Sequence, residues 1–279
     1  MLLKCLVENN AVSDDFKTEH GLSLYIETKN HRLLFDTGAS SLFTENAIKL
    51  NVNLGDVDTL VLSHGHYDHG GGIKAFLNLN DKADIYLRKG AMDKHYSEQT
   101  DGSFKRIGLD ESLSDNKRFI YSDDRVQIDD ELSLFSNVQG NLFLPSGNES
   151  LFALDQDMMI RDDFNHEQNL VIQEAGKRIL IAGCAHRGIV NIMNHMRAIG
   201  LEEPDIVIGG FHLYARSTDR TEPIDFVEAL GAELMKTKSV FYTCHCTGIK
   251  AYNELKSIMG DRIHYLATGQ IVETNIKGD

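Results

Sequence analysis

The sequence lacks the features that mark secreted, membrane and multidomain proteins. Four cysteines in 279 residues are too few for a disulfide scaffold, so we expect free thiols or metal ligands in a reducing compartment. No stretch is apolar over the length that crosses a membrane, and the polar start of the chain has no signal-peptide segment. There is also no Pro-rich linker between distinct parts of the chain. These absences predict a cytoplasmic protein without a membrane partner.

Positive charge is also scarce. The chain has 28 Lys and Arg against 42 Asp and Glu, which gives a net charge of -14. Nucleic-acid surfaces need clustered Lys and Arg, so we expect no nucleic-acid partner. A small anionic substrate remains compatible with this charge, because a bound metal ion supplies local positive charge. The sequence has neither a Gly-x-Ser-x-Gly elbow nor a Walker loop. This argues against a serine nucleophile and against a nucleotide-phosphate loop.

What the sequence does contain is a dense run of metal-ligand residues after the apolar stretch 59–62. The run is Ser63-His64-Gly65-His66-Tyr67-Asp68-His69-Gly70-Gly71-Gly72. Imidazole and carboxylate groups are ligands that Zn²⁺ accepts. Residues two apart in an extended segment point the same way, so His64 and His66 can share one ion, and the following turn can direct Asp68 and His69 at a second. We therefore predict two divalent metal ions, zinc first, with iron or manganese as alternatives.

Strand and helix patterns alternate along most of the chain. Strands are expected over 2–7, 22–27, 32–35, 59–62, 170–172, 178–182, 205–208 and 239–242. Helices are expected from a cap at Ser40 or Ser41 to Leu50, and over 70–80, 188–199, 223–235 and, after a cap at Thr247, 249–259. This alternation predicts sheets covered by helices. Residues 92–160 are less regular, and we expect either a lid over the metal site or a meandering sheet edge there.

Several of these segments together resemble the metallo-β-lactamase superfamily. The metal-ligand run has the pattern His-x-His-x-Asp-His, and the segment 34–38 looks like the strand and turn before that superfamily's metal loop. The segments 183–192, 209–213 and 244–248 resemble its branch of metal-dependent hydrolases of the β-lactamase superfamily II. The resemblance covers residues 2–269 and is weakest over 92–160. It implies an α/β chain forming one domain over 1–279, a four-layer αββα sandwich with two mixed sheets face to face and an insertion at about 92–160.

The resemblance also implies metal ligands from distant strand ends. The family pattern gives His64 and His66 to one metal, and Asp68 and His69 to the other. Cys184 stands where the superfamily places a bridging Asp or Cys. Most relatives outside this branch have Asp at that position, so a packed thiol beside the site is the alternative for Cys184.

Two histidines compete for one position in the family pattern. His166 lies just before the predicted hairpin, where the superfamily has its third histidine, and His186 lies two residues after Cys184. His245 follows a late strand and precedes a helix, as the last histidine of the pattern does. Which of Cys184, His166 and His186 complete the set of metal ligands stays open from the sequence.

Other residues are predicted to contact the substrate or support the ligands. His212 follows two glycines that allow a close backbone approach, and it is expected to touch the substrate or move a proton, with a core histidine as the alternative. Thr247 and Gly248 open a helix whose free N–H groups could hold an anionic group. Asp36 is expected to orient a ligating histidine. Buried thiols are expected at Cys244 and Cys246, and surface or structural roles at His20, His31, His95, His195 and His264.

Three functions are compatible with this residue set. The first is a dinuclear metal hydrolase in which Asp68 orients a water for attack on an ester, phosphoester or related bond of a small anionic substrate. The second is a transferase, because the resembled branch includes an archaeal dihydropterin–aminobenzene ribofuranosyl phosphate synthase, which joins a pterin methyl diphosphate to an arylamine. The third is a metal-dependent binding module without catalysis.

Overall fold

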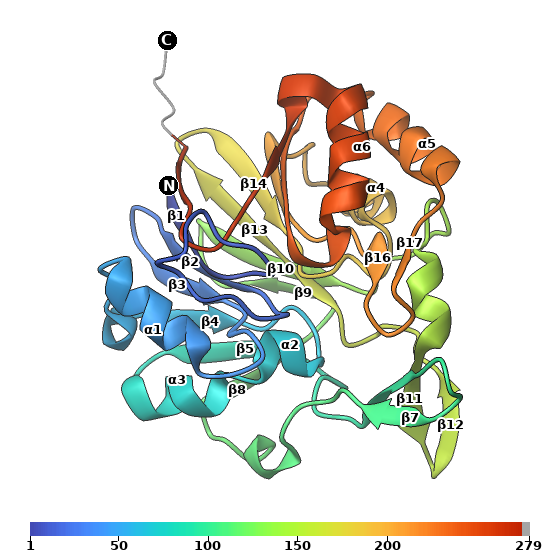
Figure 1. The fold of residues 1–279 in the computed structure, drawn as a ribbon. Helices are drawn as coiled ribbons and strands as arrows, with labels where there is room; N and C mark the ends of the chain where they lie inside the picture. The colour runs from blue at the N-terminus through green and yellow to red at the C-terminus, as the bar shows by residue number, and fades with distance from the viewer. Residues whose placement is uncertain (275–279) are drawn as a thin grey trace.

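Two mixed β-sheets pack face to face in the computed structural model, which describes residues 1–274, and helices cover their outer faces (Figure 1). The first sheet has the order β20 (Ile271–Glu273), β1 (Leu2–Val7), β2 (Ser23–Glu27), β3 (Arg32–Phe35), β4 (Thr59–Val61), β5 (Asp84–Arg88) and β8 (Phe119–Ser122). The second has the order β19 (Ile263–Tyr265), β18 (Val240–Thr243), β15 (Ile206–Gly209), β14 (Lys177–Ile181), β13 (Gln168–Glu174), β10 (Leu132–Ser136) and β9 (Arg125–Gln127).

The helices lie in two outer layers. In Figure 1, α1 (Leu42–Lys49) and α3 (Ile73–Leu79) lie beside the first sheet, and α4 (Ile189–Ala198), α5 (Ile224–Leu234) and α6 (Ile249–Met259) lie beside the second. The short helix α2 (Tyr67–Gly70) lies in the metal-ligand run. Single 3₁₀ turns are η1 (Leu54–Asp56), η2 (Glu111–Leu113), η3 (Ser146–Ser150), η4 (His245–Thr247) and η5 (Gly260–Arg262). This arrangement confirms the predicted sandwich of two sheets between helices.

Alternating side chains on the strands explain the layers. In β3, Leu33 and Phe35 face the second sheet, whereas Leu34 faces the helices, and all three are fully buried. In β14, Ile179 and Ile181 pack between the sheets, whereas the intervening leucine packs toward α4 and α5. Each sheet is therefore apolar on both faces, which is why helices must cover it.

The middle of the chain is split between the main sheets and a smaller one. Strands β8, β9 and β10 complete the edges of the two large sheets. A separate four-stranded sheet contains β12 (Met158–Arg161), β11 (Leu151–Asp155), β6 (His95–Glu98) and β7 (Phe104–Arg106). A further ribbon pairs β16 (Tyr214–Ala215) with β17 (Arg220–Thr221). The small sheet lies to one side of the sandwich, at the lower right of Figure 1.

Two details differ from the sequence prediction. The helix expected over 70–80 is divided, because α2 ends at Gly70 and α3 begins at Ile73. The cap predicted at Thr247 is wrong: the residue at that position is Gly248, and the Thr247 hydroxyl instead accepts the backbone N–H of Phe211 at 2.9 Å. No helix among residues 1–274 has the length and apolar character needed to span a membrane.

Candidate metal centre

The predicted ligands converge at the C-terminal ends of parallel strands. The metal-ligand run follows β4, Cys184 and His186 follow β14, and His245 follows β18. Parallel strands that end at one edge of a sheet bring their following turns together. Four turn residues there have positive φ without being glycine: Asp36 (59°), Ala185 (52°), His212 (50°) and His245 (51°). Such conformations cost energy and tend to cluster at functional sites.

Two glycines allow these turns to approach closely. A Cβ added at Gly65, between the first two histidines of the run, would overlap the Ala91 carbonyl oxygen. One added at Gly183 would overlap the Ser63 hydroxyl. With larger residues, the turns after β4 and β5 could not approach each other this closely at Gly65, nor could the turns of the two sheets at Gly183.

Three histidines form what we call the first ligand group: His64, His66 and His186. All three are buried, and their Nε2 atoms have no hydrogen-bond partner within residues 1–274. One nitrogen from each lies within 4.8 Å of the others. Burial and the neighbouring histidines lower the pKa of His64 and of His186 well below the usual range. Neutral imidazoles with free, converging nitrogens are what a divalent metal needs.

Four other residues form the second ligand group: Asp68, His69, His245 and Cys184. The His69 Nε2 atom lies 3.1 Å from Cys184 Sγ, 3.2 Å from His245 Nε2 and 3.9 Å from Asp68 Oδ2. Asp68 Oδ2 lies 3.3 Å from His245 Nε2. Ligands of a tetrahedral zinc ion, with bonds of about 2.0–2.3 Å, lie about 3.3–3.7 Å apart. The distances of 3.1–3.9 Å in this group are within a few tenths of an ångström of that spacing.

Cys184 borders both ligand groups. Its Sγ atom clusters within 4.8 Å with nitrogens of His64 and His69, and also with nitrogens of His186 and His212. The Cys184 thiol could therefore contact an ion held by either group.

Asp36 and Ser63 orient two of the ligands. Asp36 Oδ2 lies 2.6 Å from His69 Nδ1 and accepts the Ser63 hydroxyl at 2.7 Å. Because that hydroxyl donates to Asp36, its oxygen accepts the Nδ1–H of His64 at 2.8 Å. Both histidines therefore donate through Nδ1, and their Nε2 atoms point toward the ligand groups. The orienting role expected for Asp36 agrees with these contacts.

Two asparagines orient two more ligands in the same way. The Asn148 amide nitrogen donates to the His186 carbonyl at 2.7 Å, so its oxygen faces His186 Nδ1 at 2.9 Å. Asn9 donates to the His245 carbonyl at 3.2 Å and faces His245 Nδ1 at 3.0 Å. Each asparagine oxygen accepts an Nδ1–H, and this directs the Nε2 atom of the ring into the site.

His166 has the opposite proton arrangement. Its Nδ1 accepts the backbone N–H of Gly65 at 2.9 Å, so the proton is on Nε2, which donates to Asp162. Neither nitrogen is then free to bind a metal. Of the two histidines that the sequence left in competition, the geometry favours His186.

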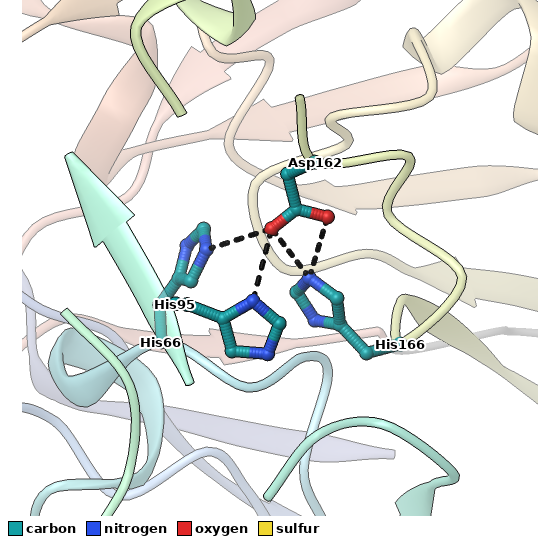
Figure 2. Close-up of side chains that lie close together, drawn as sticks. All are labelled: His66, His95, Asp162 and His166. Carbon is teal, nitrogen blue, oxygen red and sulfur yellow. Dashed lines mark hydrogen bonds and ion pairs between the residues drawn. The ribbon is translucent and has the colours of Figure 1, made fainter. Parts of the chain in front are cut away.

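Asp162 connects His166 with two other histidines (Figure 2). Its Oδ2 atom lies 3.1 Å from His166 Nε2, 3.0 Å from His95 Nδ1 and 4.0 Å from His66 Nε2. Burial alone would lower the pKa of His95, but the contact with Asp162 raises it. These four residues are of metal-ligand type, but Asp162 is hydrogen-bonded to His95 and His166, whose other ring nitrogens contact the backbone at Gly90 and Gly65. The cluster therefore attaches the small sheet, through His95, to the metal-ligand run.

Comparisons with known proteins show the family to which this fold belongs. The model of the metallo-β-lactamase superfamily matches residues 17–150. The crystal structure of Tm1679, a metal-dependent hydrolase of the β-lactamase superfamily, is 31% identical, with a TM-score of 0.80 over 98% of this chain and 99% of that one. The chain belongs to the metallo-β-lactamase superfamily.

Two curated relatives of this metallo-β-lactamase family member come from Methanocaldococcus jannaschii. One is an uncharacterised protein, 29% identical over 92% of this chain and 94% of its own length. The other is 7,8-dihydropterin-6-methyl-4-(β-D-ribofuranosyl)-aminobenzene-5′-phosphate synthase, 27% identical over 92% and 91%. The resemblance inferred from the motifs is thus confirmed over nearly the whole chain.

His20 is a residue of this metallo-β-lactamase site that the motifs did not indicate. Its Nε2 lies 3.2 Å from Asp68 Oδ2, and its ring lies 4.7 Å from the ring of His245, measured between centroids. Burial opposes ionisation of Asp68, but His69 and hydrogen bonds from His20 and His245 lower its pKa well below the usual range. Asp68 is therefore a carboxylate with three histidines around it.

The predicted substrate residues lie in different surroundings. His212 lines the pocket beside His186, with ring centroids 4.2 Å apart, and neither ring nitrogen has a hydrogen-bond partner within residues 1–274. Thr247 is fully buried, and the Tyr214 side chain packs against Gly248. Neither Thr247 nor Gly248 lines the pocket over the ligand groups, so an anion-binding role for them stays a prediction without support from this geometry.

The two remaining cysteines also differ from each other. Cys244 is packed between the two sheets with Cys5, as expected for a structural thiol. Cys246 lies beside the ligands, with its sulfur within 4.8 Å of ligand atoms of Cys184 and His245. It accepts the backbone N–H of His212 at 3.3 Å.

One pocket opens onto both ligand groups. It has a volume of about 220 Å³. Its floor includes Asp68, Cys184 and His186, and its walls come partly from the small sheet. The free Nε2 atoms and the matching ligand spacing show that these side chains fit divalent metal ions, and the pocket gives a small molecule access to them.

Proposed function

We propose that the protein is a dinuclear metal-dependent hydrolase that cleaves an ester, phosphoester or related bond in a small anionic substrate. The observation that carries this proposal is the pair of adjacent ligand groups at the floor of one pocket. The first ligand group would hold one divalent ion and the second ligand group the other, with Cys184 beside both. Zinc suits this mixture of imidazole, carboxylate and thiolate.

When bound, two such ions supply a water with a pKa lowered toward about 7 and polarise a carbonyl or phosphoryl oxygen. Asp68, held as a carboxylate, can orient the attacking water. His20 contacts Asp68 from the pocket side and keeps that carboxylate in place. His212 has two ring nitrogens without partners among the described residues, so it can donate a proton to the departing group of the substrate.

The test combines metal analysis with a substrate panel. Purified protein is expected to contain two equivalents of metal and to hydrolyse members of a panel of 4-nitrophenyl esters, bis(4-nitrophenyl) phosphate, thioesters and lactones. His64→Ala should lose both metal and activity. His264→Ala, a matched change in β19 away from the site, should lose neither. Activity that survives in His64→Ala, or an inactive metal-loaded protein, would overturn the proposal.

A second candidate is a transferase. It is favoured by the synthase that is 27% identical over 92% of this chain. In that reaction the site would bind a diphosphate leaving group instead of activating water. Incubation with a dihydropterin methyl diphosphate and an aminobenzene ribofuranosyl phosphate, followed by mass spectrometry, separates the two. A joined product without simple hydrolysis supports the transferase, whereas binding without turnover in either assay supports a non-catalytic binding protein.

A further inference from the structure

Two positively charged side chains stand at the rim of the pocket. Lys105 is in β7 of the small sheet, and Arg216 follows β16. Both are exposed, whereas the metal-ligand side chains at the floor of the same pocket are buried. The rim is therefore cationic in a chain whose net charge is -14.

Neither cation is neutralised by the protein. Within residues 1–274, no acidic side chain lies within ion-pair distance of Lys105 or Arg216. The neighbouring Arg106 gives the contrast, because it points away from the pocket and pairs with Glu111 at 2.6 Å. Alternation along β7 thus places one paired cation outside the pocket and one unpaired cation at its rim.

Tyr67 lines the pocket together with the two cations. The Lys105 ammonium lies 6.0 Å from the centre of the Tyr67 ring. The three side chains come from separate parts of the chain, and all three line the pocket.

The wall between rim and floor can hold the rest of an organic molecule. Ile107, Leu151 and the Tyr67 ring supply apolar surface, and the hydroxyls of Ser150 and Ser217, 3.4 Å apart, supply hydrogen bonds. Lys105 and Arg216 line the same pocket, and ammonium and guanidinium groups are the side chains that bind a phosphate or carboxylate group.

We propose that Lys105 and Arg216 form a subsite for an anionic group of the substrate that is separate from the group attacked at the metal centre. This inference rests on the proposed function for the site at the floor of the pocket. It assigns the substrate class as an organic molecule with a phosphate or carboxylate some distance from the scissile bond. It also places anion recognition on the small sheet and the turn after β16, not at the start of α6.

The test compares two esters of equal length, mono(4-nitrophenyl) glutarate, which is anionic, and 4-nitrophenyl pentanoate, which is neutral. The ratio of their kcat/KM values is expected to fall about tenfold in Lys105→Met and in Arg216→Met, because each loses a charge-assisted contact. Arg106→Met, the matched change on the other face of β7, should keep the wild-type ratio. The ratio is insensitive to partial loss of folded enzyme. An unchanged ratio in both rim variants would overturn the subsite.

Binding separates failure of the subsite from failure of the proposed function. Calorimetric titration of the metal-loaded protein measures its affinity for phenylphosphonate and for benzoate, a phosphonate and a carboxylate ligand. This measurement does not depend on hydrolysis. If the metal-loaded wild type hydrolyses no member of the substrate panel, the proposed function fails. The subsite still stands when phenylphosphonate or benzoate binds about tenfold more weakly to Lys105→Met and Arg216→Met than to Arg106→Met. Equal affinity of all variants for both ligands rejects it.

Discussion

Asn148 holds His186 at two points, its amide nitrogen on the backbone carbonyl and its amide oxygen on Nδ1. The same two contacts join Asn9 to His245. Because the amide nitrogen is committed to a carbonyl, the amide oxygen must face the ring, and the ring must present Nε2 to the metal. One asparagine serves the first ligand group and the other serves the second.

Replacing either asparagine should lower the affinity of one ligand group for its metal ion. Asn148→Ala should lower metal affinity at the first ligand group, and Asn9→Ala at the second, each by about 10–100-fold, because the ring orientation is lost. Competition with a chromophoric chelator measures both affinities. Asn194→Ala on α4, where the side chain accepts a hydrogen bond from Arg197 and contacts neither His186 nor His245, should leave both affinities unchanged. Two unaltered affinities in Asn148→Ala and Asn9→Ala would contradict the orienting role.

Replacing His186 and replacing His166 should have different effects on the metal content of the protein. His186→Ala should lose about one metal ion per chain, because it removes a free Nε2. His166→Ala should keep both ions but unfold more easily, by about 1–3 kcal/mol, since Asp162 and the Gly65 N–H lose a buried partner. Elemental analysis gives the stoichiometry, and denaturant unfolding gives the stability. Loss of an ion in His166→Ala and not in His186→Ala would reverse the assignment.

Gly65 should not tolerate a side chain. Gly65→Ala would place Cβ against the Ala91 carbonyl, so the loop between His64 and His66 must shift. We expect lower metal content together with a lower melting temperature, measured by elemental analysis and circular dichroism. Gly55→Ala, where the added atom meets nothing closer than 3.3 Å, is the control. A fully metal-loaded Gly65→Ala would show that the close approach is unnecessary.

His31 should make stability depend on pH. Its Nδ1 lies 3.0 Å from Asp58 and its Nε2 lies 2.6 Å from Asp129. Burial lowers the pKa of His31, but hydrogen bonds with the two aspartates raise it above the ordinary value. A raised pKa in the folded state stabilises the protein below the unfolded pKa of about 6.5, and this stabilisation is lost as pH rises through the folded pKa.

Comparison with His31→Gln tests this dependence. The difference in free energy of unfolding between wild type and His31→Gln should be largest below about pH 6.5 and should shrink as pH increases. Urea titrations across a pH series measure it, and groups common to both proteins cancel in the difference. A difference that grows with pH would show that the charged form of His31 is not the stabilising one.

The sequence predicted the parts of the site that lie close together in the chain. Four ligand-type residues between His64 and His69, after an apolar strand, predicted a metal loop, and the alternation of strands and helices predicted the layers. The choice between His166 and His186 could not be made, because it depends on the Gly65 N–H, 101 residues from His166. His20 carried no local signal, since its partner Asp68 lies 48 positions away and is brought near only by the packing of turns.

The ligand groups draw residues from both halves of the sandwich: 64–69 come from the first sheet, and Cys184, His186 and His245 from the second. A metal ion bound by side chains of both sheets exists only when the sheets are assembled, so occupancy and folding form one linked equilibrium. A metal ion whose free concentration is about 100 times its Kd adds about 2.7 kcal/mol to the free energy of unfolding. Metal supply would therefore set how long the folded protein persists, in addition to whether it acts on a substrate.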